Sequence, residues 1–541
     1  MFDMDEKVRT TSSVKKAAVT IGPKCKLTLL DAKKVGIELL PVHLDENAYA
    51  EMKRSHAFLK TYINKRVPIY GINTQFGDQV NLLDGNLKNH DSSLYYDSIN
   101  NRQTNLIKSH ACGMGDAVSA AIVRVAILLR AQCLSQGYSG VSPNVVESML
   151  ASLNAGIVPL VPKYGSIGAS GDLIPLATIA AALIGDNINV QYQGTIMPAA
   201  HALKLAGLKP LKPEMRDGLA MINGTSFMTA IASISFCHLN RLFKQMLASI
   251  AMMLESAMVI SSAYDPLVHQ LKRQKGQIEI NNFLLAFWKG SRLLSDLDDL
   301  RTQHGQTFNT SNQHSTKPVQ DYYSIRSVAQ GFGPFQENLT RATAWVENEM
   351  NSVNDNPIIN VSDEKIYHGA NFMGYYITDA CDILKMNIGQ ASTWLHALLA
   401  NLVHPRKNHH LPANLVEHPE KYNGFRPIQL LAAALAVQNR KLAQSHQSFN
   451  LPTEGDNQDV NSLGTHAALD FRESVENLER LTAIMLLASV QALELRGIEK
   501  ASPSAQNIYQ TIRKQSPAVA NCRVMQHELN TIVSLLRAEE I

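Results

Sequence analysis

Apolar residues recur every three or four positions through most of the chain, which is the spacing of one face of an α-helix. The stretch from Ala117 to Gln136 is one example. The same spacing predicts helices at residues 30–39, 46–63, 173–184, 225–263, 337–353, 378–403, 427–445 and 465–495. Several of these stretches exceed 20 residues, whereas the mean helix has about 11 to 12. The pattern therefore predicts a mainly α-helical protein with a central bundle of long helices.

Strand-like segments are few in this sequence. We expect short strands only at residues 188–192 with 195–197, and at 358–361 with 365–367. The resulting plan has a flexible N-terminal tail over 1–25, an N-terminal region over 26–225, the long-helix bundle over 226–515 and a C-terminal helical segment over 516–541. There is no clear internal repeat.

Composition agrees with a packed helical protein and excludes several classes of partner. Hydrophobic residues make up 45% of the 541 positions, and aromatic residues only 6%. The 50 basic and 47 acidic residues leave a formal charge of +3, which is too small a field to indicate nucleic acid or a membrane surface. We expect small molecules or copies of the same chain as partners.

Cysteine usage and the N-terminus indicate a reducing, cytoplasmic location. Six cysteines are scattered without a C-x-x-C pair, so neither a zinc ribbon nor a disulfide framework is predicted. The start of the chain lacks the basic and then apolar pattern of a signal peptide. The most apolar long stretch, Gln245 to Ala263, is interrupted by Glu255 and several serines, so we interpret it as a buried helix.

Two glycine-rich segments interrupt the helical pattern. The segment Tyr70–Asp78 contains two glycines and predicts a mobile loop. The second segment, Gly165–Leu173, contains the tripeptide Ala169-Ser170-Gly171 between two predicted helices. Taken alone, this tripeptide is common and favours an ordinary loop before a helix.

The tripeptide can also react with itself to make an electrophile. Small residues let the Gly171 nitrogen reach the Ala169 carbonyl carbon, because a β-carbon would obstruct the five-membered ring. Ser170 supplies a hydroxyl that can leave, so two dehydrations give a methylene beside an imidazolone. Asp172 follows, where it can take up protons or cap the helix that Leu173 opens.

The segment Gly165–Leu173 resembles the cofactor-forming signature of the aromatic amino acid ammonia-lyases, the family of histidine, phenylalanine and tyrosine ammonia-lyases and related aminomutases. Further motifs agree with the family in order along the chain, at Tyr70–Thr74, Gly218–Thr225, Gln320–Arg326, Asn354–Pro357, His368–Phe372 and Asn457–Val460. The resemblance covers roughly residues 25 to 515. It implies the long-helix lyase fold, a 4-methylidene-imidazol-5-one (MIO) formed from Ala169, Ser170 and Gly171, and a homotetramer with shared active sites.

The resemblance also implies a role for each matched residue. The imidazolone would capture the substrate amino group while Tyr70 removes a β-proton, which requires a lowered tyrosine pKa or late proton transfer. Arg326 would bind the substrate carboxylate as a bidentate fork. The remaining residues of this group would hydrogen-bond the imidazolone carbonyl and the substrate, namely Asn223, Gln320 and Tyr323.

Substrate choice depends on fewer residues. Ser109 and His110 fall where the family contacts the substrate side chain, and His110 can hydrogen-bond a phenol or an imidazole. Phenylalanine-specific members of the family tend to place Phe-Leu at these two positions. Histidine lyases typically have Glu at the position of Gln458, whereas tyrosine or phenylalanine lyases have Gln, and a neutral amide removes the charge that would favour a cationic imidazole. Tyrosine is therefore the predicted substrate, giving p-coumarate and ammonia. The other substrate-binding positions implied are Leu173, Asn356 and Met373.

Departures from the family keep alternatives open. Gln75 stands where glycine is usual in the mobile loop, and a slow lid would allow ammonia to add back at the β-carbon, as in aminomutases. The alternatives are a histidine or phenylalanine lyase, a 2,3-aminomutase, or an inactive helical scaffold. We expect no metal or nucleotide site, and interpret His404, His409 and His410 as solvated or substrate-rim residues.

Overall fold

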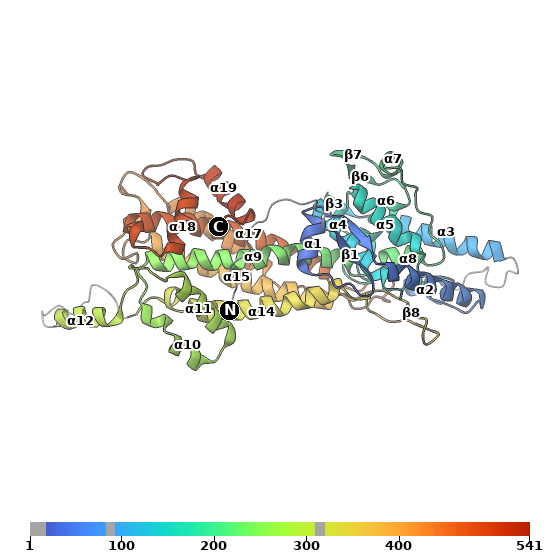
Figure 1. Ribbon diagram of the computed structural model, residues 1–541, viewed down its shortest axis with the longest axis horizontal. Coiled ribbons are helices and arrows are strands. Elements are labelled where there is room, and N and C mark those ends of the chain that lie inside the picture. The colour runs from blue at the N-terminus through green and yellow to red at the C-terminus, as the bar shows by residue number, and fades with distance from the viewer. Residues whose placement is uncertain (1–17, 83–91, 309–319) are drawn as a thin grey trace. The chain divides into compact units, whose positions relative to one another are not determined.

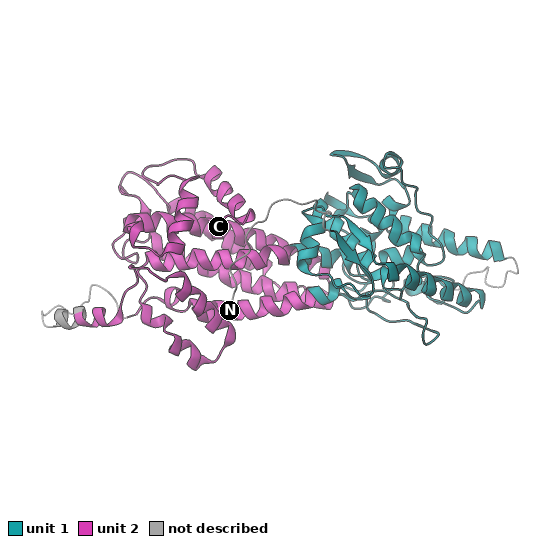
Figure 2. Ribbon diagram, in the orientation of Figure 1, with its two compact units in different colours: residues 1–234, 347–374, 451–462 teal, residues 235–346, 375–450, 463–541 magenta. Residues whose placement is uncertain are grey.

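The computed structural model describes residues 18–82, 92–308 and 320–541 (Figure 1). Helices dominate this part of the chain, so the prediction of a mainly α-helical protein is confirmed. The chain forms two compact units (Figure 2). Unit 1 holds the described residues up to Ile234 together with Glu347–Gly374 and Leu451–Ser462. Unit 2 holds Ser235–Val346, Tyr375–Asn450 and Leu463–Ile541.

Unit 1 combines helices with small sheets. Its helices are α1 (Leu29–Gly36), α2 (Glu46–Asn64), α3 (Ser92–His110), α4 (Ala120–Ser135), α5 (Pro143–Ala155), α6 (Leu173–Leu183), α7 (Ala199–Leu205), α8 (Asp217–Ile222) and the first part of α9 (Ser226–Ser256). Its strands are β1 (Val19–Ile21), β2 (Val42–Leu44), β3 (Met114–Ala117), β4 (Val158–Pro159), β5 (Pro162–Tyr164), β6 (Asn189–Tyr192), β7 (Thr195–Pro198), β8 (Ile358–Asn360) and β9 (Lys365–Tyr367). The parallel pair β1–β2 differs from the others, since β3–β5, β4–β6–β7 and β8–β9 are antiparallel.

A hydrophobic core in unit 1 fixes the segment that carries Tyr70. Ile69 and Ile72 are both almost completely buried, on either side of Tyr70 and Gly71. They pack with Leu59 and Ile63 of α2 and with further buried residues, namely Tyr95, Ile99, Met215 and Ile359. Burial of an aliphatic side chain of this size stabilises by about 1.5–3 kcal/mol. The first residues of the loop are therefore held in place by the hydrophobic core.

Unit 2 is a bundle of long helices. Its helices are the rest of α9, α10 (Pro266–Lys272), α11 (Lys275–Phe287), α12 (Leu297–Phe308), α13 (Tyr323–Arg326), α14 (Val328–Met350), α15 (Tyr375–Val403), α16 (Arg426–Leu442), α17 (Gly464–Arg496), α18 (Pro503–Arg513) and α19 (Gln526–Arg537). α15, α16 and α17 pack along one another. Their contact surfaces carry buried aliphatic residues at helical spacing, as along Leu395, Leu398 and Leu402 of α15.

Most predicted elements occur with shifted ends. Both predicted strand pairs are present as β6–β7 and β8–β9. The helix predicted from Ala117 begins only at Ala120, because Met114–Ala117 pairs with β5. α14 starts at Val328, well before the predicted Glu337, and continues through the exposed Pro334. The helices that the periodicity did not predict include α3, α5 and α18.

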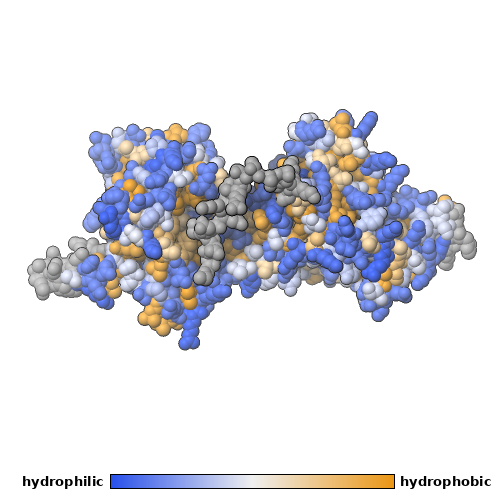
Figure 3. All heavy atoms as spheres, in the orientation of Figure 1, coloured by the Kyte–Doolittle hydropathy of each residue, from blue (hydrophilic) through white to orange (hydrophobic). Residues whose placement is uncertain are grey.

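The face of the protein shown in Figure 3 is largely hydrophilic, with separate hydrophobic areas. No helix within the described ranges is long and apolar enough to cross a membrane. All six cysteines lie in those ranges, none of them in a disulfide, and Cys133 and Cys381 are buried.

Candidate active site

The tripeptide Ala169-Ser170-Gly171 lies immediately before α6 and rests against the chain at Gly224. Gly171 has a φ of +68°, which a residue with a side chain adopts only with strain. A β-carbon at Gly171 would lie 2.7 Å from the Gly224 Cα and would overlap its carbonyl. The Asp172 backbone N–H donates to the Gly224 carbonyl at 2.8 Å. Glycine at position 171 is therefore required for this close approach.

Side chains hold both flanks of the tripeptide. The buried Asp172 carboxylate accepts hydrogen bonds from Ser166 Oγ at 2.7 Å and from the Met228 backbone N–H at 2.8 Å. Before the tripeptide, the Gly168 N–H donates to Ser166 Oγ at 3.1 Å. The Gly168 carbonyl accepts from Ser462 Oγ at 2.9 Å. These contacts bring α9 and the segment 451–462 to the tripeptide.

Tyr70 is half-buried and is held at its backbone and at its ring. Its N–H donates to Nε2 of His368 at 3.4 Å, and its hydroxyl oxygen accepts from the Gly77 N–H at 3.5 Å. The ring meets Phe76 edge to face, with 6.3 Å between centroids. The adjacent Gly71 carbonyl accepts from Gln103 Nε2 of α3 at 2.8 Å.

Burial raises the pKa of the Tyr70 phenol, and the Glu454 carboxylate raises it further, while the Gly77 N–H acts in the opposite direction. Glu454 was not predicted from the sequence as a site residue. A β-carbon at Gly77, whose φ is +57°, would overlap the Glu454 carboxylate. The sequence feature that could have identified Glu454 is its place four positions before Gln458, close to the family motif Asn457–Val460.

A cavity of about 290 Å³ in unit 1 brings several predicted residues together. Tyr70 lines it with Ala169 and Ser170, and the other predicted lining residues are Asn356, Met373 and Gln458. Further lining residues are Gly77, Val80, Ala370, Phe372, Asn457, Asp459 and Val460. The proposed base, the reactive tripeptide and the proposed specificity residue thus share one cavity.

Two asparagines have different environments at this site. Asn223 is 2% exposed, and its Oδ1 is buried without a hydrogen-bond partner, so its amide still has unused bonding capacity. It ends α8, one residue before Gly224. The Asn356 Oδ1 accepts from the Gly369 N–H at 2.9 Å, which fixes the amide at the cavity wall.

Gln458 presents a neutral amide to the cavity. Its Oε1 accepts from Thr453 Oγ1 at 2.9 Å, and backbone hydrogen bonds pair the same two residues. The side-chain NH2 is therefore the group left to act as a donor. Gln75 does not line the cavity, and its backbone N–H donates to the Leu82 carbonyl at 2.9 Å.

Ser109 and His110 end α3 and are not among the residues that line the cavity. His110 Nδ1 lies 2.9 Å from the Leu106 carbonyl, which can only accept, so this nitrogen carries the proton. Nε2 of the neutral ring is then an acceptor. The chain after His110 continues into β3, which pairs with β5 just before the tripeptide loop. Gly113 and Gly165 lie close together at this pair, since a β-carbon at Gly165 would be 3.7 Å from the Gly113 Cα. Leu173 is half-buried at the start of α6.

The other predicted site residues belong to unit 2. Gln320 and Tyr323 are exposed, Tyr323 at 75%. The Arg326 guanidinium lies 4.6 Å from the centroid of the Tyr323 ring, and its Nε donates to the Asp321 carbonyl at 3.0 Å. The terminal nitrogens of Arg326 make no further described hydrogen bond, which suits a fork for a carboxylate.

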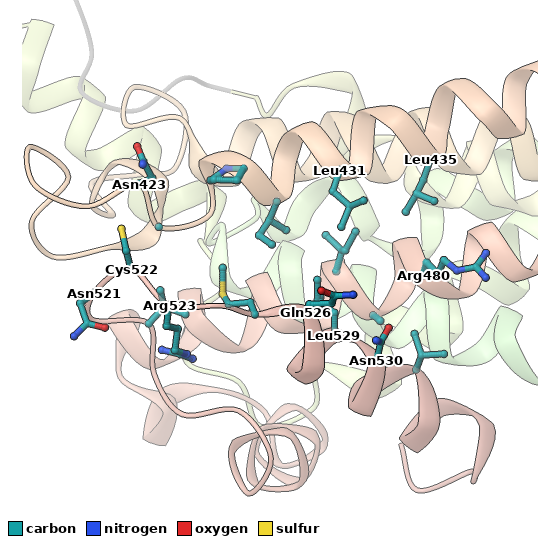
Figure 4. Close-up of a pocket in the computed structure, with 18 residues that line it drawn as sticks. Asn423, Leu431, Leu435, Arg480, Asn521, Cys522, Arg523, Gln526, Leu529 and Asn530 are labelled. Atoms are coloured by element: carbon teal, nitrogen blue, oxygen red, sulfur yellow. The ribbon is translucent and has the colours of Figure 1, made fainter.

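Other regions offer weaker candidates. Across the described residues, no group of three or more His, Cys, Asp or Glu is arranged to hold a metal ion. His404 and His410 are exposed and His409 is half-buried. A larger groove of about 600 Å³ lies in unit 2. Figure 4 shows the side chains that line it, among them the apolar Leu431 and Leu435. Its described lining contains none of the predicted site residues.

Comparisons with known proteins show similarity over most of the chain. Residues 27–514 match the aromatic amino acid lyase family. A histidine ammonia-lyase of Geobacillus thermodenitrificans is 33% identical over 95% of this chain and 96% of its own length. A tyrosine 2,3-aminomutase of Chondromyces crocatus is 33% identical over 91% of each chain. The tyrosine aminomutase structure from Streptomyces globisporus superposes with a TM-score of 0.90 at 29% identity, over 97% of both chains.

Proposed function

Because the chain belongs to the aromatic amino acid lyases, which are carbon–nitrogen lyases, we propose that it eliminates ammonia from L-tyrosine to give p-coumarate. The observation that carries this proposal is the shared cavity, which Tyr70 lines together with Ala169, Ser170 and Gln458. A base, a potential electrophile and a side chain able to select the ring are the parts that this elimination needs.

The residues around the tripeptide fit an MIO group formed from Ala169, Ser170 and Gly171. Gly171 lets the Gly224 backbone pack directly against the tripeptide, and Asn223, one residue before Gly224, holds a buried Oδ1 without a hydrogen-bond partner. When present, the MIO group supplies the electrophile that activates the substrate amino group. The Asn223 side-chain NH2 would donate to the imidazolone carbonyl, and Asp172 would hold the loop through its contacts to Ser166 and Met228.

Tyr70 is the residue we assign to remove the β-proton. Because burial raises its pKa, the phenolate must be favoured by charge that arrives with the substrate or the cofactor. The substrate ammonium can offset the negative charge of Glu454, which otherwise opposes the phenolate. Gln320, Tyr323 and Arg326 would bind the substrate carboxylate, and we assign them to the cavity of a neighbouring subunit, as the family resemblance implies.

Gln458 is the main support for tyrosine over histidine. Thr453 occupies its amide oxygen, so the NH2 group can donate to the oxygen of a phenol at the cavity wall. The amide carries no charge to attract a cationic imidazole. His110 adds an acceptor nitrogen that suits a phenol O–H, once the ring lies near the end of α3.

A tyrosine 2,3-aminomutase is the second candidate, and histidine or phenylalanine deamination follows. The observation that supports the aminomutase is the loop after Tyr70, because a side chain from α3 restrains its backbone. Arg102 Nη1 donates to the Ile72 and Thr74 carbonyls at 3.3 and 2.9 Å. A restrained loop retains the unsaturated product with ammonia for longer, which favours re-addition.

A homotetramer is the proposed assembly. α16 exposes Leu430 at 70% and Val437 at 63%, and Leu431 lies beside them. Exposed large apolar side chains along one helix are typical of a surface that another subunit covers. Light scattering should give four times the chain mass.

A product assay tests the proposed function. Purified protein is incubated with tyrosine, phenylalanine and histidine in turn, and the unsaturated acids are followed by ultraviolet absorbance while β-amino acids are sought by chromatography. We expect p-coumarate from tyrosine as the fastest product. Dominant urocanate from histidine would contradict the substrate assignment, and dominant β-tyrosine would establish the mutase.

A further inference from the structure

The motif Asn354-Asp355-Asn356-Pro357 is only partly used by the cavity. Asn356 lines the cavity, whereas Asn354 and Asp355 are buried behind it at 4% and 0% exposure. Asp355 accepts from Arg216 in a two-pronged contact at 2.9 and 3.0 Å and from Ser139 Oγ at 2.6 Å. The motif therefore rests on a buried ion pair that cannot move easily.

Arg130 of α4 joins this ion pair to Asn354. Its side chain is fully buried, and its Nη2 lies 3.7 Å from the Asp355 carboxylate. Its Nη1 donates to the Asn354 Oδ1 at 3.0 Å. The same Oδ1 accepts from the Thr225 N–H at 3.3 Å, so Asn354 fixes the backbone directly after Gly224.

Arg130 and Asn354 form the support of Gly224 on the side away from the tripeptide. A β-carbon at Gly224 would lie 2.5 Å from the Asn354 Oδ1 and would overlap the Arg130 Nη1. The Gly224 backbone in turn pairs with Gly171 and accepts the Asp172 N–H. The Arg130 guanidinium and the Asn354 amide therefore contact Gly224, and Gly224 contacts Gly171. Neither glycine has room for a β-carbon.

We propose that Arg130 and Asn354 are positioning residues for formation of the imidazolone ring, acting through Gly224. The proposal rests on the proposed function, because it concerns the maturation of the same site. Ring closure requires the Gly171 nitrogen to approach the Ala169 carbonyl carbon to about 3–3.5 Å before bonding. Because Arg130 and Asn354 prevent the Gly224 backbone from moving away, Gly171 has few positions open to it. The Gly171 nitrogen is thereby held near the Ala169 carbonyl carbon.

The bonds of this step balance without an added reagent. A bond forms between the Gly171 nitrogen and the Ala169 carbonyl carbon, whose oxygen leaves as water with the protons of the Gly171 and Ser170 nitrogens. A double bond then joins that carbon to the Ser170 nitrogen. Loss of the Ser170 Cα proton and hydroxyl as a second water makes the methylene. The mature chain is lighter by two waters, roughly 36 Da.

The variant Asn354→Ala tests the proposal, because it removes the oxygen that Arg130 and Thr225 share. We expect soluble, folded protein in which most chains keep the unmodified mass by intact-mass spectrometry. The variant Asn354→Asp retains an acceptor oxygen and should restore the two-water deficit to most chains. A merely structural role would lower the unfolding midpoint without changing the mass of the folded chains.

Asn439→Ala is the matched control. Asn439 is as deeply buried, in unit 2, and donates to Ser392 Oγ at 2.9 Å and the Ser474 carbonyl at 3.2 Å. It should keep the full deficit while losing stability. A complete deficit in folded Asn354→Ala would overturn the proposal. If Asn354→Ala does not fold, Arg130→Lys is measured instead, because lysine keeps the positive charge but lacks the Nη1 that donates to Asn354. A complete two-water deficit in folded Arg130→Lys would likewise overturn the proposal.

The wild-type chain separates this proposal from the one it rests on. A wild type lacking the deficit would refute the MIO assignment itself, and with it any need for positioning. A wild type with the deficit, together with Asn354→Ala chains of unmodified mass, supports both.

Discussion

Gln103 connects the Tyr70 loop to the helix that leads to Asn223. It is fully buried in α3, its Nε2 donates to the Gly71 carbonyl at 2.8 Å, and its Oε1 accepts from the Leu219 N–H at 2.9 Å. Gln103→Leu keeps much of the side-chain volume and removes both hydrogen bonds. Each backbone group left unpaired in the interior costs about 1–3 kcal/mol. We expect the variant to lose about 2–6 kcal/mol of unfolding free energy.

The same substitution should reduce catalysis more than its effect on stability alone would suggest. Tyr70 precedes the freed Gly71 carbonyl, and a displacement of about 1 Å at a reacting group can cost about 100-fold in rate. The assays are urea unfolding at fixed protein concentration and steady-state turnover of tyrosine. Thr104→Ala, on the same helix but half-buried with one hydrogen bond to the Asn100 carbonyl, is the control and should change both little. A Gln103→Leu protein that unfolds within about 0.5 kcal/mol of wild type, with unchanged kcat, would refute the reasoning.

The remaining predictions concern ionisation and substrate. Burial raises the pKa of Tyr70, so kcat/KM should rise with pH from about 7 to about 9 as the base form grows, and Tyr70→Phe should remove activity; a falling limb over that range would contradict the assignment. Burial raises the pKa of Asp217 to about 7, so the folded chain keeps a proton that the unfolded chain releases, and stability should fall as pH rises from about 4 to about 7; an equal slope in Asp217→Asn would show that another group is responsible. Gln458→Glu should improve kcat/KM for histidine relative to tyrosine, and an unchanged ratio would mean that this position does not select the ring. Ser170→Ala should leave a folded chain without the two-water deficit and without activity, as measured by mass and turnover.

Periodicity predicted the long helices because their apolar faces are repeated many times. α15 and α17 were placed within a few residues of their observed ends for this reason. α5 was missed although its ends carry clear signals. The Ser142 hydroxyl caps the helix, Pro143 occupies its first position, and Gly156 ends it with a φ of +78°. Capping residues would have found what the short apolar repeat did not.

Contacts between distant segments are what the sequence could not provide. The parallel pair β1–β2 depends on a register between Val19 and Val42, which no local pattern reveals. Glu454 reaches Gly77 only because the segment 451–462 returns to unit 1. The motif residues that share the cavity were predictable from the family resemblance. The contacts of Arg130 with Gly224, and of Gly224 with Gly171, could be found only in the folded structure.

The most direct test of the central claim is the mass of the wild-type peptide that contains Ala169, Ser170 and Gly171. After proteolysis of purified protein, this peptide should be lighter than its sequence by two waters, roughly 36 Da, with the loss confined to the tripeptide. A peptide of full, unmodified mass from active, folded protein would contradict the claim that this chain makes its own electrophile.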